Sequence, residues 1–344
     1  MRRRAAVALG LSVVLLGIFI TLVGWDDVLD SIERASLSVY AIAVGGSLAT
    51  LAFRSEVWRR VLSVVDQPRP YWLVASVFTT ATFIKYVTPY GQVASGVGNA
   101  AIVSRYTDAA YEESLAAVVS ADVMTYVPYY TFGLVGVVYL FAQVSPPIDP
   151  EPYLFPAVGM VAIVAFIALF VWVQRSRVST AIVRVVVGFR GVVARISPRR
   201  AAFLTRENVE RRLQDFTLTL ELVSRNRRSM TLALVYGHLA WLGLALALYA
   251  SAAAVGTPLP VGIVLLSVAL SKLGFVVPTP GGLGGVEATL ATVVYLLAPS
   301  GVGMTVATAT AIAILYRFAT YWLTVAVGGT TSVALTIVDP RPAD

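Results

Sequence analysis

Long apolar stretches, separated by short polar segments, are the feature that most limits how this chain can fold. A helix needs about 20 apolar residues to cross the roughly 30 Å hydrocarbon core of a membrane. Stretches of roughly that length or longer lie near residues 5–23, 37–53, 71–104, 113–141, 153–173, 230–252, 260–298 and 303–335. Only 13% of the 344 residues are charged, about half the usual share in a soluble domain. The sequence therefore predicts an all-α protein that crosses a membrane several times.

The composition and motifs exclude several classes of function. The chain has no cysteine and one histidine, which excludes disulfides, thiolate metal sites and histidine-cluster metal sites. It contains no phosphate-binding P-loop, no His-Glu-x-x-His and no Gly-x-Ser-x-Gly pattern. We therefore expect no metal, no cofactor, no enzymatic activity and no nucleic-acid partner.

The positions of the basic residues predict how the chain is oriented in the membrane. Basic residues concentrate at 2–4, 54–69, 105, 174–229 and 341. The loops at 24–36, 142–152, 253–259 and 299–302 hold one arginine, Arg34. Because cytoplasmic loops are enriched in Arg and Lys, we expect a multi-pass protein of the cell membrane with both termini in the cytoplasm.

This orientation requires 71–104 and 260–298 each to enter and leave the membrane on the same side. Each stretch also contains a Pro-Gly break, at 87–92 and at 278–283, and such residues disfavour a helix interior. We therefore expect two broken, re-entrant helical hairpins within a single membrane domain, 1–344.

The two halves of the domain follow the same plan. From the start of the preceding stretch to the Thr-Pro pair there are 51 residues in one half and 49 in the other. The sequence thus predicts an inverted-topology repeat, with repeat 1 at 37–141 and repeat 2 at 230–335. The alternative is two unrelated helices that each happen to be broken by proline.

Residues 174–229 are predicted to form a cytoplasmic connector of amphipathic helices that lie along the membrane surface. The arginines expected to contact lipid at the interface are Arg54, Arg59, Arg105, Arg184 and Arg195. The alternative is a solvated connector with the ordinary positive charge of a cytoplasmic loop.

Ionisable residues within apolar stretches mark functional sites, because each is costly in lipid. They are Lys85, Asp122, His238, Lys272, Glu287 and Arg317. Each lysine lies in the first limb of a hairpin, just before the break. Thr88 and Thr279 are expected to cap the second limbs, so that two helix N-termini point into the membrane interior.

Two helix N-termini, two lysines and an arginine predict a binding site for an anionic lipid headgroup. The expected binding residues are Lys85, Thr88, Pro89, Gly91, Gln92, Lys272, Thr279, Pro280, Gly281, Gly282, Tyr316 and Arg317. Asp122 and Glu287 are expected either to form structural ion pairs or to carry a coupling proton, and His238 to be a hydrogen-bonded core residue. The alternative for the lysines is that their side chains extend to the nearest membrane interface.

These breaks resemble those of a known family, the lysylphosphatidylglycerol synthase transmembrane region, also called the flippase-like domain family. The resemblance covers nearly the whole chain and is most specific at Val277–Ala288, which reads VPTPGGLGGVEA, and at Leu315–Trp322, which reads LYRFATYW. In the first half it is weaker and rests on 53–59 and 88–92. The segment 120–125, which includes Asp122, departs from the charged pair that many members carry there.

The resemblance implies lipid handling without the cytosolic synthase domain. Such domains occur as flippases for aminoacylated phospholipids, or beside enzymes that attach sugars to polyprenyl or dolichyl phosphates. Two hypotheses follow. In the first, the protein moves an anionic lipid or a polyprenyl-phosphate-linked sugar across the membrane, with its headgroup between the two hairpins. In the second, it is a non-transporting subunit that binds a lipid-linked sugar or recruits a glycosyltransferase.

Overall fold

The computed structural model describes residues 21, 25–88, 91–143, 174–196 and 204–338. Throughout these residues the regular structure is helical, as the apolar pattern predicts. Five helical segments are long and apolar enough to cross a membrane: Leu37–Val65, Tyr111–Leu140, Arg227–Ala254, Pro280–Leu297 and Val306–Ile337. The predicted spans at 5–23 and 153–173 lie outside the described residues.

The chain divides into two compact units, one of residues 1–145 and 223–344 and the other of residues 146–222. The described helices of the second unit are α8 (Arg175–Gly188), α9 (Arg190–Ile196) and most of α11 (Arg206–Arg225). This unit falls largely within the predicted connector. All the other helices that the structure describes belong to the first unit, which contains the site described below.

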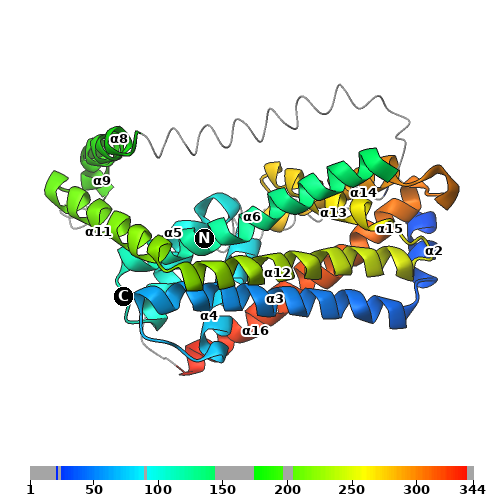
Figure 1. The fold of residues 1–344 in the computed structure, drawn as a ribbon, viewed down its shortest axis with the longest axis horizontal. Coiled ribbons are helices and arrows are strands. Elements are labelled where there is room, and N and C mark those ends of the chain that lie inside the picture. Colours follow the sequence, from blue (N-terminus) through cyan, green and yellow to red (C-terminus); the bar gives the residue numbers. More distant parts are fainter. Residues whose placement is uncertain (1–20, 22–24, 89–90, 144–173, 197–203, 339–344) are drawn as a thin grey trace. The chain divides into compact units, whose positions relative to one another are not determined.

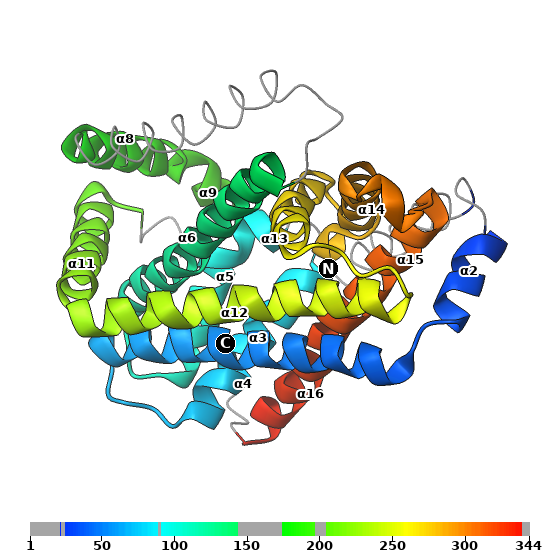
Figure 2. The same ribbon diagram turned by 45° about the vertical axis from the view of Figure 1, so that its right-hand side comes forward.

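A pair of long helices, α3 (Leu37–Val65) and α12 (Arg227–Ala254), forms the centre of the first unit. They lie side by side along most of their length (Figures 1 and 2). The backbones approach closely at Gly46 and Gly243, where a Cβ on either residue would lie 2.6–2.7 Å from the carbonyl oxygen of the other. Small residues at a crossing of this kind are typical of helix packing in membranes.

The first half continues from α3 into two shorter helices and one long helix. They are α4 (Tyr71–Val87), α5 (Gly91–Tyr106) and α6 (Tyr111–Gln143). The predicted stretch 71–104 is thus divided at its Pro-Gly sequence, and α4 packs against α5.

The second half has a similar plan with more irregular breaks. After α12 come α13 (Val261–Leu270), the 3₁₀ turns η1 (Ser271–Val276) and η2 (Pro280–Gly282), α14 (Gly285–Leu297), the 3₁₀ turn η3 (Ser300–Val302), α15 (Val306–Arg317), the π-helical turn η4 (Phe318–Trp322) and α16 (Leu323–Val338). A short helix, α2 (Trp25–Glu33), precedes α3 and packs against α15.

The two halves exchange contacts in a reciprocal way. The first limb of the first broken stretch, α4, packs against α16, which follows the second break. The first limb of the second, α13, packs against α6, which follows the first break. Each half therefore completes the packing of the other. The inverted topology and the re-entrant course of the hairpins stay predictions.

Buried apolar residues form two main cores within the first unit. One lies among α12, α13, α14 and α15, and includes Leu248, Leu290 and Ile312. The other lies among α3, α4, α5 and α6, and includes Val57 and Val77. Large apolar side chains remain exposed on the outer faces of the long helices, for example on α6 and α16. This is the arrangement of a chain whose outer surface faces lipid.

Candidate functional site

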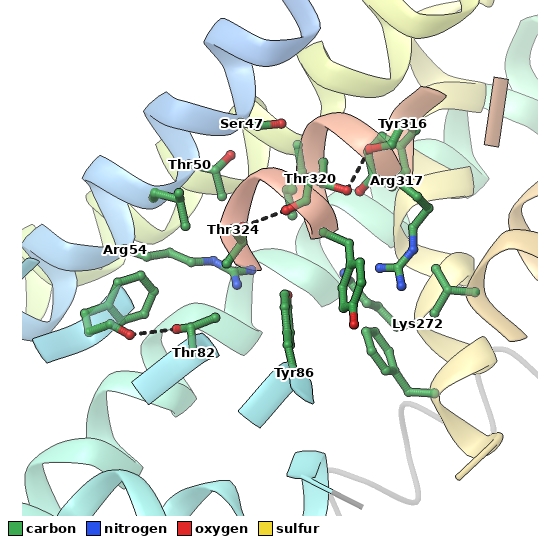
Figure 3. Close-up of a pocket in the computed structure, with 16 residues that line it drawn as sticks. Ser47, Thr50, Arg54, Thr82, Tyr86, Lys272, Tyr316, Arg317, Thr320 and Thr324 are labelled. Carbon is green, nitrogen blue, oxygen red and sulfur yellow. Dashed lines mark hydrogen bonds between the residues drawn. The ribbon is translucent and has the colours of Figure 1, made fainter. Parts of the chain in front are cut away.

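A small polar cavity lies between the two apolar cores. Its volume is about 30 Å³, which is room for one or two water molecules. Leu51 and Phe78 line it from one core, and Leu244 and Tyr316 from the other. The polar residues of its wall are Ser47, Thr50, Arg54, Thr82, Tyr86, Lys272, Tyr316, Arg317, Thr320, Tyr321 and Thr324. Both halves of the chain therefore contribute to one enclosed site (Figure 3).

Helix α3 supplies Ser47, Thr50 and Arg54 to the cavity. Their spacing of three and four residues places them on one face of the helix. Arg54 Nε and Ser47 Oγ are buried, and neither has a hydrogen-bond partner among the residues that the structure describes. A buried polar group without a partner destabilises a fold, and these two donors are available to a ligand in the cavity.

Lys272 enters the cavity from the 3₁₀ turn η1, where the helical path tightens before the break. Its Nζ lies 5.5 Å from the ring centroid of Trp241 and 5.4 Å from that of Phe275. Aromatic faces attract a cation most strongly where water is scarce. Cation–π contacts with these two rings therefore hold the ammonium group of Lys272 in the cavity. Within the described part of the chain, no carboxylate is close enough to form an ion pair with it.

Arg317, at the end of α15, has contacts of a different kind. Its Nε donates to Glu287 Oε1 at 2.7 Å, and its Nη2 donates to the carbonyl oxygen of Gly281 at 2.8 Å. Its guanidinium also lies 4.4 Å from the ring centroid of Tyr321. Both charged side chains are buried, with 6% and 2% exposed. Arg317 is therefore partly neutralised, and it fixes the Pro-Gly break against α15.

The Pro-Gly break differs from the prediction at its helix start. Thr279 does not cap the long second limb, because its Oγ1 donates to the carbonyl oxygen of Leu283 at 2.8 Å. Positive φ angles at Gly281, Gly282 and Gly284 delay the α-helix until Gly285.

At that later start, Glu287 Oε2 accepts the backbone N–H of Gly284 at 2.8 Å. The carboxylate of Glu287 thus occupies the N-terminus of α14. The expectation that this helix end binds a ligand anion stays a prediction, now with Glu287 as a competing acceptor within the chain.

The hydroxyl groups of the cavity threonines already donate to the helix backbone. Thr50 Oγ1 lies 2.9 Å from the carbonyl oxygen of Ala240, Thr320 Oγ1 2.7 Å from that of Tyr316, and Thr324 Oγ1 2.6 Å from that of Thr320. A hydroxyl that donates to a carbonyl keeps only its acceptor lone pairs for other contacts. The donors left to the cavity are therefore the two cations, Ser47 and the hydroxyls of the three tyrosines, Tyr86, Tyr316 and Tyr321.

More cations than anions surround the cavity. Lys85 and Asp122 are within electrostatic range of each other and of Arg54. Lys272 is within range of Arg54, Arg317 and Lys85. Glu287, which pairs with Arg317, is the second carboxylate near the cavity. The four cations Arg54, Lys85, Lys272 and Arg317 thus lie near two carboxylates. The site has a formal surplus of two positive charges, and its electrostatic effect is strong because the surroundings are apolar.

The cavity contains only part of the predicted binding set. Lys272, Tyr316 and Arg317 line it, whereas Lys85 lies nearby without reaching the wall. The break residues Pro280, Gly281 and Gly282 are buried against the adjoining helices rather than exposed to the cavity.

At the first break, Thr88 ends α4 and is exposed, and Gly91 begins α5 with its N–H donating to the carbonyl oxygen of Thr88 at 3.0 Å. Pro89 and the side chain of Gln92 lie outside the described residues. Their predicted role in binding stays a prediction.

The structure places the predicted interfacial arginines in different surroundings. Arg54 lines the cavity, whereas Arg59 forms two hydrogen bonds of 2.6 Å with Glu56. Arg105 lies 5.9 Å from the ring centroid of Tyr106. In the second unit, Arg184 and Arg195 are exposed.

His238 lies away from the cavity wall. Its Nδ1 is 2.8 Å from the carbonyl oxygen of Leu234, and its Nε2 is 3.1 Å from Thr131 Oγ1. These contacts are those of a hydrogen-bonded packing residue. Among the described residues, no group of three or more His, Cys, Asp or Glu side chains lies close enough to hold a metal ion.

Sequence reasoning missed most of the uncharged polar residues of the cavity, with the exception of Tyr316. Ser47, Thr50, Thr82 and Tyr86 line it and were not selected. One signal was available, because polar residues recur at helical spacing within apolar stretches, as in the series Ser47, Thr50, Arg54. A search for polar stripes, rather than for ionisable residues alone, finds these positions.

Comparison with known proteins agrees with this description. No curated protein matches the chain. The family model of the lysylphosphatidylglycerol synthase TM region matches residues 5–328, which is nearly the whole chain. The chain is therefore a multi-pass membrane protein that belongs to the family of the lysylphosphatidylglycerol synthase transmembrane region.

Proposed function

We propose that this protein is a non-enzymatic lipid flippase that moves an anionic lipid, or a polyprenyl-phosphate-linked sugar, across the cell membrane. One observation carries the proposal: a cavity inside the membrane-spanning unit has two cations, Arg54 and Lys272, without carboxylate partners among the described residues. Isolated charges within a membrane are costly and mark substrate pathways. A negatively charged headgroup is the natural partner for them.

Transport requires the cavity to open, because about 30 Å³ is far too small for a lipid headgroup. Irregular backbone next to the site provides places where this can occur. The break at 277–284 has three glycines with positive φ, and η4 is a π-helical turn directly after Arg317. Discontinuous helices of this kind form the moving parts at the substrate sites of many transporters.

The lipid moves either down its own concentration gradient or by coupling to the movement of an ion. Glu287 accepts hydrogen bonds from Arg317 and from the backbone of Gly284, which favours a structural role for its carboxylate. Asp122 has only electrostatic contact with Lys85 and Arg54. We therefore assign any coupling proton to Asp122 rather than to Glu287.

Transport is tested by reconstituting the full chain into liposomes that contain a fluorescent phosphatidylglycerol or a fluorescent polyprenyl phosphosugar. Chemical quenching from outside measures how fast inner-leaflet lipid becomes exposed. We expect the wild type to move the lipid faster than empty vesicles, and Lys85→Ala plus Lys272→Ala to slow it. Equal rates in all three samples would exclude transport. Binding of the phosphosugar without movement would support the alternative of a non-transporting subunit that serves a glycosyltransferase.

Orientation is a separate part of the proposal. We assign both termini and the arginine-rich connector at 174–229 to the cytoplasm, on the basis of the basic residues in these segments. The membrane lipids themselves are then the principal partners of the protein.

A further inference from the structure

The charged hydrogen-bonding groups that lack a partner in the described part of the cavity are donors. Arg54 Nε and Ser47 Oγ are buried donors without partners among the described residues. Among the described residues, Lys272 Nζ contacts the aromatic rings of Trp241 and Phe275 and has no hydrogen-bond partner. Arg54 comes from α3 and Lys272 from η1, so that two separate elements present donors to the same small space (Figure 3).

The remaining charges near the cavity largely cancel. The carboxylate of Glu287 pairs with Arg317, and Asp122 lies within electrostatic range of both Lys85 and Arg54. A formal charge of about two therefore stays uncompensated in apolar surroundings. The ligand that complements this site accepts hydrogen bonds on several sides and carries about two negative charges.

A phosphate monoester meets these conditions better than the other common lipid headgroups. At neutral pH it carries between about −1.5 and −2 charges and presents three strong acceptor oxygens. A phosphate diester, as in phosphatidylglycerol or a sugar-linked polyprenyl phosphate, carries one negative charge. A sugar also brings a ring and several hydroxyl groups, so its entry requires the cavity of about 30 Å³ to open further than a phosphate does.

We infer that the cavity binds a phosphate monoester, the terminal phosphate of a lipid monophosphate, between Arg54 and Lys272 with Ser47 as a third donor. This inference rests on the proposed function and narrows it, since the cargo becomes a lipid whose headgroup is the phosphate alone. Free phosphate has the same chemistry, so the test includes it separately.

The test measures equilibrium binding to the purified full chain in detergent. Three probes are used: farnesyl phosphate as the monoester, farnesyl methyl phosphate as the matched diester, and inorganic phosphate. We expect the monoester to bind about tenfold or more tightly than the diester, which is the lower end of what one charge-assisted hydrogen bond contributes. Arg54→Gln and Lys272→Gln should each weaken monoester binding and remove most of that preference.

Arg60→Gln is the matched control, because Arg60 lies on the same helix and pairs with Glu56 outside the cavity. It should leave the preference unchanged. A second measurement separates lost binding from lost folding. Removing an uncompensated buried cation should not lower the thermal stability of the ligand-free protein. An Arg54→Gln protein that has lost its fold would contradict the account of Arg54 as an unpaired ligand group.

Each other outcome also decides the question. Equal binding of the monoester and the diester would overturn the inference and leave transport of anionic lipids standing. Binding of inorganic phosphate without farnesyl phosphate would show a site for the free ion and overturn the lipid part. If no probe binds while the liposomes still move phosphatidylglycerol, the inference fails and the proposed function survives. If neither binding nor transport occurs, the proposed function fails as well.

Discussion

The ion pair between Glu287 and Arg317 allows a quantitative prediction about stability. Glu287→Ala removes the carboxylate that accepts Arg317 Nε at 2.7 Å and the N–H of Gly284 at 2.8 Å. Arg317, only 5% exposed, would then lie buried without a counter-charge. Breaking a buried pair in this way typically costs about 3–5 kcal/mol. Arg317 keeps its bond to Gly281 and its contact with Tyr321, so we expect a value near the lower limit, about 3 kcal/mol.

The assay is reversible unfolding in mixed detergent micelles, which gives the free energy of unfolding for each variant. The exposed pair of Arg34 and Asp30, with side chains 79% and 60% exposed, provides the control. Asp30→Ala should cost less than about 1 kcal/mol. The double variant Glu287→Ala with Arg317→Met should lose clearly less stability than the two single variants lose in sum. The coupling free energy between the two positions should be about 1 kcal/mol or more. A Glu287→Ala cost as small as that of Asp30→Ala, or strict additivity, would refute the role of this ion pair.

Two further predictions concern packing and topology. Gly46→Ala should destabilise the protein by about 1–3 kcal/mol, because the new Cβ would lie 2.7 Å from the carbonyl oxygen of Gly243. Gly45→Ala, at a position with no neighbour within 4 Å, should be neutral or stabilising in the same unfolding assay, so an equal loss at both glycines would contradict the close crossing. The chain has no cysteine of its own, so single cysteines can be introduced at exposed positions. An impermeant maleimide should label the Gly301→Cys variant from outside the cell. It should label the Gln67→Cys variant only after the membrane is opened. Labelling of both from the same side would contradict the predicted orientation.

Much of the helical layout follows from the sequence, because it depends on apolar length and on proline and glycine. The stretches 113–141 and 230–252 correspond closely to α6 and α12. The Pro-Gly sequences near 88 and 280 divide their stretches as predicted. These features are local, so the periodicity and the chain-breaking residues are sufficient to find them.

The position of Arg54 did not follow from the sequence, because it depends on how far a helix continues. The apolar stretch 37–53 ends at Arg54, which therefore resembled an interfacial residue. Helix α3 instead runs for 29 residues to Val65, a length of about 43 Å at 1.5 Å per residue. Arg54 thus lies well inside the helix, and only the packing of α3 against the other half shows that it faces a cavity.

The start of α14 was also beyond sequence reasoning. A Thr-Pro pair is a common helix start, and Thr279 followed by Pro280 satisfied that pattern. The glycines after it adopt positive φ angles that interrupt the helix, and Glu287 stabilises a later start at Gly285. Glycine permits many backbone conformations, so its presence alone could not show which one the packing selects.

The central claim is that an anionic lipid headgroup enters the cavity, and photo-crosslinking tests it most directly. The reconstituted full chain is irradiated with an anionic phospholipid that carries a diazirine in its headgroup, and the labelled peptides are identified by mass spectrometry. The account predicts adducts within 37–65 and 261–276, absent with a zwitterionic analogue and strongly reduced by Arg54→Gln. Adducts confined to exposed outer faces, such as Leu134 and Val138 on α6, and unchanged by Arg54→Gln, would contradict it.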